Sequence, residues 1–200
     1  MGATPLISQD NKRNARLQSI KDKQHFGEKK TTRQQKQILR KRNNRVGDYI
    51  SKAAKMIVKY CLEHNIGNIV CGSNDFQRNS NLGTANNQNF VNLPFGRFRE
   101  KLEYLCELHG IVYTEQEESY TSKASFWDKD DIPVYDADNP QEYTFSGKRI
   151  KRGLYRTSTG RTLNADVNGA LNILKKSSVV ALTGLYGRGD VATPARIRVS

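Results

Sequence analysis

The chain of 200 residues has few of the features that mark a zinc site, a disulfide framework or a membrane anchor. Its three cysteines, Cys61, Cys71 and Cys106, are scattered, and no Cys and His residues are spaced as zinc ligands. Because Met1–Leu6 does not resemble a secretory signal, we expect reduced thiols in a cytoplasmic protein. No apolar run approaches the roughly eighteen residues of a membrane span, so we expect no membrane partner.

Acidic residues are also scarce relative to basic ones, and the formal net charge is +13. Such a charge favours a polyanionic partner, which without a membrane segment is expected to be a nucleic acid. Residues 29–45 contain eight cations and no acid, which predicts the exposed start of a long helix that contacts phosphates. The alternatives are a solvated charge run or a flexible arm. The expected nucleic-acid contacts are Lys29, Lys30, Arg33, Lys36, Arg40, Lys41, Arg42 and Arg45, with a second cluster at Lys148, Arg149, Lys151 and Arg152.

Apolar periodicity predicts the framework of an α/β fold. One helix is expected from residue 46 to residues 64–65, and a second helix ends at His109. Buried strands are predicted at Ile66–Cys71 and Ile111–Thr114, each following one of these helices. This order favours a layer of at least partly parallel strands, with residues 72–94 as a loop. The predicted core faces are Val46, Ile50, Ala53, Ile57 and Cys61 on the first helix and Phe98, Leu102, Leu105 and Leu108 on the second.

An acidic residue opens the last predicted helix, residues 164–176. Asp166 stands near the positive end of this helix, where a carboxylate remains ionised with its oxygens accessible. Asn164, Asn168 and Asn172 recur four residues apart and therefore share one helix face. An Asp near a helix start is also common without any function, so this motif alone does not identify a site.

Three further acids, Glu115, Glu117 and Glu118, stand at the end of the second predicted strand. A strand end beside a helix start is where ligands bind in open α/β sheets. Metal-dependent nucleases need two or three converging carboxylates, whose oxygens suit Mg²⁺ or Mn²⁺. Taken alone, the glutamates are better explained as an exposed, charged strand end.

Three ordered motifs change this interpretation. They are Glu117-Glu118-Ser119-Tyr120-Thr121-Ser122-Lys123, then Phe145-Ser146-Gly147-Lys148-Arg149 with Arg152-Gly153-Leu154-Tyr155, and finally Asn164-Ala165-Asp166-Val167-Asn168-Gly169-Ala170-Leu171-Asn172-Ile173. Together they closely resemble the C-terminal region of the OrfB/TnpB family, transposon-encoded "transposase" proteins related to the type V CRISPR effectors. The resemblance runs from roughly Leu17 to Lys176.

The resemblance implies an RNA-guided DNA endonuclease with a partial RNase H-like (RuvC) nuclease domain and an inserted target-nucleic-acid-binding module. It implies DNA and a guide RNA as partners, Mg²⁺ or Mn²⁺ as cofactor, and a prokaryotic protein that is nucleoid-associated when DNA-bound. Asp166 matches the last catalytic carboxylate, and Asp166 with Glu118 would hold the metal. Glu117 is the other candidate for the second catalytic acid, but side chains alternate along a strand, so only one of the two is expected to face the metals. We favour Glu118.

The chain departs from the family pattern at the expected second carboxylate. Most members carry a Glu just after the first predicted strand, where this chain has Gly72. The glutamates at 117 and 118 resemble a subgroup in which this acid has moved to the neighbouring strand. A first catalytic Asp is not found before residue 45, because Asp10 and Asp22 lie in polar sequence unlike the family's first nuclease strand.

The family's zinc ribbon is a further departure. Residues 124–165 contain neither Cys nor His, so zinc is not expected. This segment is predicted to be irregular, with hairpin-like pieces at Tyr143–Phe145 and Leu154–Arg156. A small apolar core is expected to replace the metal, formed by Trp127, Tyr135, Tyr143 and Phe145.

We therefore expect the C-terminal portion of a longer protein whose nuclease site is incomplete alone. The expected segments are a basic arm at 1–45, a partial RuvC core at 46–122, the inserted module at 123–163, a closing catalytic helix at 164–176 and a disordered tail at 177–200. One alternative is a nuclease-dead DNA- or RNA-binding module or repressor, and another is a fragment that does not fold stably. The oligomeric state is left open.

Overall fold

The computed structural model describes residues 3–23, 32–73, 94–136, 138–182, 185 and 194. The chain divides into two compact units. The helical unit consists of residues 1–65, 83–109 and 197–200, and the mixed unit consists of residues 66–82 and 110–196. Helices and strands are both present, so the prediction of a mixed α/β protein is confirmed at that level. The predicted loop at 72–94 lies mostly outside the described residues.

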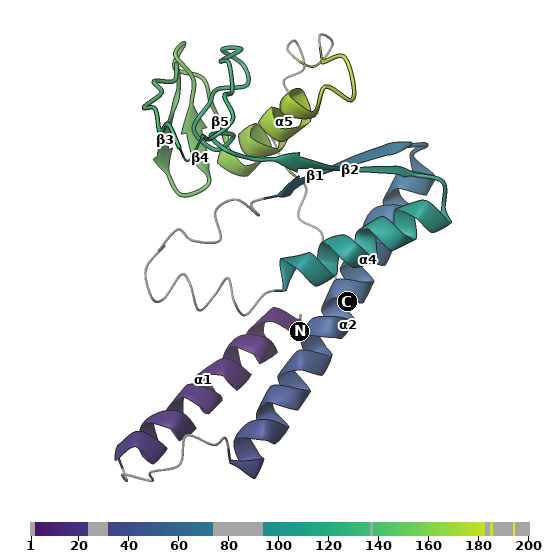
Figure 1. Cartoon of the computed structure of the whole chain (residues 1–200), viewed down its shortest axis with the longest axis vertical. Coiled ribbons are helices and arrows are strands. Elements are labelled where there is room, and N and C mark those ends of the chain that lie inside the picture. The colour runs from purple at the N-terminus through teal and green to yellow at the C-terminus, as the bar shows by residue number, and fades with distance from the viewer. Residues whose placement is uncertain are drawn as a thin grey trace. The chain divides into compact units, whose positions relative to one another are not determined.

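The helical unit contains α1 (Ala3–Lys23), α2 (Arg33–Glu63) and α4 (Phe95–Leu108). Helix α2 begins at a capping box in which Thr32 and Gln35 exchange hydrogen bonds, and it ends before His64 as predicted. Figure 1 shows α1 beside the first half of α2 and α4 beside its second half. The buried apolar residues of α2 are Ile38, Val46, Ala54, Val58 and Cys61. Those of α4 are Leu102, Leu105 and Cys106.

Two predicted core positions in this unit are wrong. Ile57 and Leu108 are 36% and 62% exposed, whereas Ala54, Val58 and Cys106 are buried in their place. The reason is the direction from which the helices meet: α2 packs against α4, and the buried side of α2 carries Ala54 and Val58 rather than Ile57. A single-helix pattern does not specify that direction.

The mixed unit contains two small sheets. Strands β1 (Asn68–Ser73) and β2 (Val112–Glu117) pair in parallel, with Asn68 opposite Val112, which confirms the predicted parallel pairing. Strands β3 (Lys148–Lys151), β4 (Leu154–Arg156) and β5 (Thr162–Asn164) form an antiparallel sheet in that order. Helix α5 (Ala165–Ser177) follows β5 directly and packs against both sheets. Of the two predicted hairpin pieces, Leu154–Arg156 is a strand and Tyr143–Phe145 is not.

The apolar core beside α5 differs from the predicted aromatic set. Tyr155, Leu163 and Ala165 are buried together, and Trp127 packs against them. Tyr135 and Tyr143 are instead 43% and 40% exposed. Trp127 therefore has the predicted role, whereas those two tyrosines are wrong as core residues.

Two buried asparagines on α5 hold the turn formed by residues 121–126. Asn168 accepts a hydrogen bond from Phe126 N (3.1 Å) and donates one to Ala124 O (2.7 Å). Asn172 donates to Thr121 O (2.9 Å) and to Ala124 O (2.7 Å). Both side chains are fully buried. They supply partners for backbone groups that would otherwise be buried without one.

Two aspartates tie the same segment to the two loops that border β3 and β4. Asp128 accepts from Ser125 Oγ (2.6 Å), Ser158 N (3.0 Å) and Ser158 Oγ (2.6 Å). Asp130 accepts from Ser125 N (2.8 Å), Ser146 N (3.1 Å) and Ser146 Oγ (2.5 Å). We call these five residues the aspartate–serine clasp. Each carboxylate receives three donors, which joins residues 125–130 to positions 146 and 158 without a metal.

We expect Asn168→Ala to lower the free energy of unfolding of the mixed unit by about 2 kcal/mol or more, because Phe126 N–H would remain buried without an acceptor. Trp127, the chain's single tryptophan, lies in this unit, so urea unfolding followed by its fluorescence measures the effect. The exposed Asn139→Ala in the same unit is the matched control, with an expected change within about 0.5 kcal/mol. Equal effects at both positions would contradict a structural role for Asn168.

Candidate functional site

Asp166 lies in the first turn of α5, and the local sequence explains why the helix starts there. Asn164 is the N-cap, and its side-chain oxygen accepts from Asp166 N (2.8 Å) and Val167 N (3.1 Å). The Asp166 carboxylate is therefore left out of the capping interaction, and its side chain is 83% exposed. It stands at the positive end of the helix dipole, available to a cation or a solvent molecule.

Glu118 is the residue after β2, and its side chain lies across the neighbouring strand β1. A Cβ atom placed on Gly72 would overlap Glu118 Oε2 and would lie 2.9 Å from Ile173 Cδ1. The Glu118 carboxylate therefore occupies the space that a side chain at position 72 would fill. The sequence placed the family's missing Glu at Gly72, and the structure places the carboxylate of Glu118 against that same residue.

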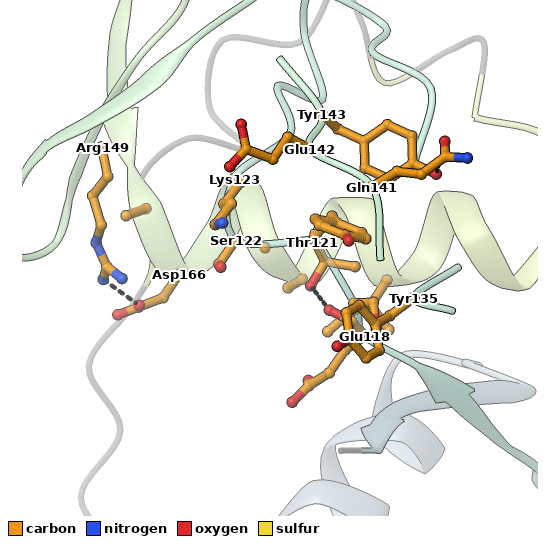
Figure 2. A pocket seen from close by; sticks show the side chains of 16 residues that line it. Glu118, Thr121, Ser122, Lys123, Tyr135, Gln141, Glu142, Tyr143, Arg149 and Asp166 are labelled. Carbon is orange, nitrogen blue, oxygen red and sulfur yellow. Dashed lines mark hydrogen bonds and ion pairs between the residues drawn. The ribbon is translucent and has the colours of Figure 1, made fainter. Parts of the chain in front are cut away.

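Glu118 and Asp166 line one open cavity of about 860 Å³ in the mixed unit. Figure 2 shows that the two residues come from different elements, Glu118 from the end of β2 and Asp166 from α5. Other lining residues include Tyr120, Lys123, Tyr135, Glu142, Tyr143 and Arg149. Glu142 is an acid that the sequence patterns did not single out, because it stands alone in irregular sequence. The cavity thus combines carboxylates, cations and aromatic rings.

Glu117 is held away from this cavity by Lys176. The Lys176 ammonium group, 7% exposed, pairs with Glu117 and also donates to Ser119 O (3.3 Å) and Pro133 O (3.1 Å). Burial by itself raises the pKa of Glu117, but hydrogen bonds from Lys176 and Ser119 and the charge of Lys176 outweigh it, so the pKa lies below 4.5. Lys176 thereby fixes the residues on both sides of Glu118. The sequence offered no signal for Lys176 beyond its place at the end of a helix.

The second basic cluster lies on β3 and the turn after it, beside the cavity. Arg149 Nη2 is 3.5 Å from Asp166 Oδ1, an exposed pair that contributes little to stability. Lys148, Lys151 and Arg152 are exposed. The sequence predicted this cluster as a nucleic-acid contact but not that one of its cations meets Asp166.

The first basic cluster lies on α2, as far as the structure describes it. Lys29 and Lys30 lie outside the described residues. Exposed cations are Arg33, Lys36, Arg40 and Lys41, and Arg42 is half-buried. Arg45 pairs with Asp10 of α1, so one of the eight cations has a counter-charge that the local sequence did not reveal.

Within the described residues, no three His, Cys, Asp or Glu side chains lie close enough together to hold one metal ion. In the same residues, no helix is both long and apolar enough to cross a membrane. The described carboxylates that line the cavity are those of Glu118, Glu142 and Asp166, and carboxylate oxygens are hard donors of the kind that Mg²⁺ and Mn²⁺ prefer.

Comparison with known proteins gives two family models and one solved fold that match this chain. A family model described as a probable transposase of the OrfB, IS605 type matches residues 8–75, and a Cas12f1-like TNB domain model matches residues 95–173. A chain from the cryo-EM structure of a Cas12f1–sgRNA–target DNA complex is similar in fold, with a TM-score of 0.53 and 16% sequence identity. The match covers 85% of this chain and 41% of that chain. No curated protein is significantly similar to this chain.

The two family models match adjacent parts of the chain, and one fold of known structure spans both. The architecture is that of a mixed α/β protein similar in fold to a chain of the Cas12f1 complex. Together these matches support an OrfB/TnpB-type protein.

The ion pair of Glu117 and Lys176 predicts a pH-dependent stability. Because the pKa of Glu117 is lowered on folding, its contribution is present above the unfolded-state value of 4.5 and is lost as the pH falls through the lower folded-state value. At pH 7 we expect Glu117→Gln to lower the free energy of unfolding by about 3 kcal/mol, since it leaves the Lys176 charge buried without its partner.

The difference between Glu117→Gln and the unmodified chain is expected to shrink as the pH falls below 4.5, measured by urea unfolding with Trp127 fluorescence. Glu115→Gln is the control, because Glu115 is exposed on the same strand. A difference that is independent of pH, or equal at both glutamates, would show that Glu117 is not held as an ionised partner of Lys176.

Proposed function

We propose that the chain forms part of an RNA-guided, metal-dependent DNA endonuclease and contributes Glu118 and Asp166 to its nuclease centre. The observation that carries this proposal is that the two carboxylates, which come from separate elements, line one cavity that also contains Arg149 and Lys123. The similarity to the two family models supports the reaction class. The Cas12f1 complex contains a guide RNA and target DNA, and we propose that this chain has partners of the same two kinds.

The donor set fits Mg²⁺ or Mn²⁺, which Glu118 and Asp166 would hold by their carboxylate oxygens. A divalent ion in such a site supplies Lewis-acid stabilisation of the phosphate and lowers the pKa of a bound water. Arg149 lies within reach of Asp166 and is proposed to bind a phosphate oxygen of the strand in the cavity. Gly72 leaves room for the Glu118 carboxylate, and Lys176 holds the Glu117 side chain and the Ser119 carbonyl on either side of it.

We propose further that the carboxylate set of this chain is incomplete for cleavage by itself. Two-metal hydrolysis needs carboxylates on both sides of the metal pair, and no group of three potential ligands is present in the described part of the chain. That observation also favours the second candidate function, a nuclease-dead DNA- or RNA-binding module. The two candidates differ in whether Glu118 and Asp166 ever support metal-dependent cleavage.

The separating experiment joins this chain to the upstream segment of a family member and supplies guide RNA and Mg²⁺. We expect target cleavage by the joined protein and none by the 200-residue chain alone. Asp166→Ala and Glu118→Ala should each reduce the cleavage rate on the order of 10³-fold, since several kcal/mol of metal stabilisation are lost, with little change in DNA binding. Rates are measured by single-turnover cleavage of labelled DNA.

A matched pair of glycine variants controls for general damage to the cavity. Gly72→Ala is expected to displace the Glu118 carboxylate and slow cleavage. Gly169→Ala is the control, because Gly169 also lines the cavity and a Cβ atom there would meet nothing within 4 Å. Magnesium-dependent cleavage by the isolated chain that Asp166→Ala removes would show that its carboxylate set is complete. Absence of cleavage in every joined protein would favour the binding module.

The basic cluster on α2 predicts salt-dependent binding to DNA and RNA. If about six phosphates are neutralised, the affinity should fall on the order of 10³-fold between about 50 and 200 mM salt. Arg40→Ala should reduce the slope of log affinity against log salt by about one, because Arg40 is exposed. Arg45→Ala should leave the slope unchanged, because Arg45 is paired with Asp10. Fluorescence anisotropy measures both, and a salt-independent affinity would contradict the proposal.

A further inference from the structure

Tyr120 has a backbone conformation that tyrosine rarely adopts. Its φ is +61°, in the left-handed region, where a bulky side chain is strained and Gly or Asn is normal. The residue is in a tight turn that Thr121 closes by donating from its N (3.3 Å) and its Oγ1 (2.8 Å) to Glu118 O. These hydrogen bonds involve backbone and threonine atoms, so a glycine at position 120 would form the same turn with less strain.

The ring that this turn presents belongs to an aromatic group that lines the cavity. Tyr120 contacts Tyr143 edge-on with ring centroids 5.1 Å apart, and its ring centroid is 6.5 Å from that of Tyr135. All three rings line the cavity, and two of them are more than a third exposed. We call Tyr120, Tyr135 and Tyr143 the aromatic wall. Rings that served only as a core would be covered, as Tyr155 is.

The aromatic wall faces groups that suit the backbone of a nucleic acid. Figure 2 shows Tyr135 and Tyr143 on one side of the cavity and Arg149 with Asp166 on the other. Lys123 lies 5.9 Å from the centroid of the Tyr120 ring. Tyr120 is also two residues from Glu118, so a base on the wall would have its phosphate near the carboxylates. Aromatic rings beside cations are the combination with which proteins bind single strands.

We propose that the aromatic wall is a stacking subsite for one unpaired nucleobase of a single-stranded nucleic acid in the Glu118–Asp166 cavity, an inference that rests on the proposed function. A duplex stacks its bases on one another and offers no free base face, so the subsite selects single strands. Stacking accepts any base, since every base has a π-face. Tyr120 is therefore a positioning residue, and the strain of its turn is explained by the ring that it places.

The test compares Tyr120→Gly, Tyr120→Phe and the unmodified 200-residue chain without any metal. Fluorescence anisotropy measures binding to a short single-stranded DNA and to the corresponding duplex. We expect Tyr120→Gly to weaken single-strand binding on the order of tenfold, with the salt dependence unchanged because no phosphate contact is lost. Duplex binding should change less than about twofold, and Tyr120→Phe should retain the affinity.

Two further readouts separate stacking from a structural effect. A 2-aminopurine base in the single strand should be quenched by the unmodified chain and by Tyr120→Phe but not by Tyr120→Gly. The thermal midpoint of Tyr120→Gly, followed by Trp127 fluorescence, should be no lower than that of the unmodified chain, because the left-handed strain is relieved. If that variant unfolds, Tyr143→Ala, at the exposed rim, should show the same selective loss for single strands.

Equal weakening of single-strand and duplex binding would contradict the proposal of a stacking subsite. Unchanged single-strand binding in Tyr120→Gly and Tyr143→Ala would also contradict it. Because these measurements use no metal and no cleavage, their failure leaves the proposed nuclease centre intact. Conversely, if Asp166→Ala fails to affect cleavage in the joined protein, the nuclease proposal fails and the binding result still stands.

Discussion

The mixed unit depends on the two buried asparagines of α5, because their side chains are the hydrogen-bond partners of buried backbone groups in the turn at residues 121–126. Ala124 O and Phe126 N lie in the interior, where an unpaired backbone group costs about 1–3 kcal/mol. Asn168 and Asn172 provide both partners from one helix face. This contact fixes residues 121–126 to α5, so the residues just before the turn and the first turn of α5 share one rigid arrangement. The carboxylates of Glu118 and Asp166 are thereby held around one cavity although they come from different elements.

The aspartate–serine clasp extends the same principle into the segment where the family resemblance implies a zinc ribbon. A carboxylate has about four lone-pair sites, and Asp128 uses three of them on Ser125 and Ser158. Burial raises the pKa of Asp128, but these hydrogen bonds outweigh it and lower the pKa below its ordinary value, which keeps the ionised form that the clasp requires. Charge-assisted hydrogen bonds are roughly twice as strong as neutral ones. They can therefore join two loops as thiolate ligands around a metal would, without thiol chemistry.

The sequence predicts those parts of the fold that depend on local pattern. It predicts the end of α2, the strand pair and the start of α5, because periodicity, a strand after each helix and an N-cap are all local signals. The sequence does not predict which residues are buried where this depends on the direction in which two helices pack, as at Ile57 and Leu108. It also does not predict ion pairs between residues distant in sequence, such as Asp10 and Arg45. Sequence motifs alone indicate Asp166, Glu117 and Glu118 as site residues. Only packing against Lys176 and Gly72 distinguishes the environments of the two glutamates.

The contact between Gly72 and Glu118 explains why the missing acid on β1 does not argue against a metal site. A side chain at position 72 and the Glu118 carboxylate would occupy the same space, and two carboxylates there would also repel each other. A side chain at position 72 would have to displace the flexible end of Glu118, so a glutamate at position 72 of β1 and a glutamate just after β2 would compete for the same space between two parallel strands. Glycine at position 72 leaves that space to Glu118. The lack of an acid at position 72 therefore does not count against the proposal that Glu118 is the second carboxylate of the metal site.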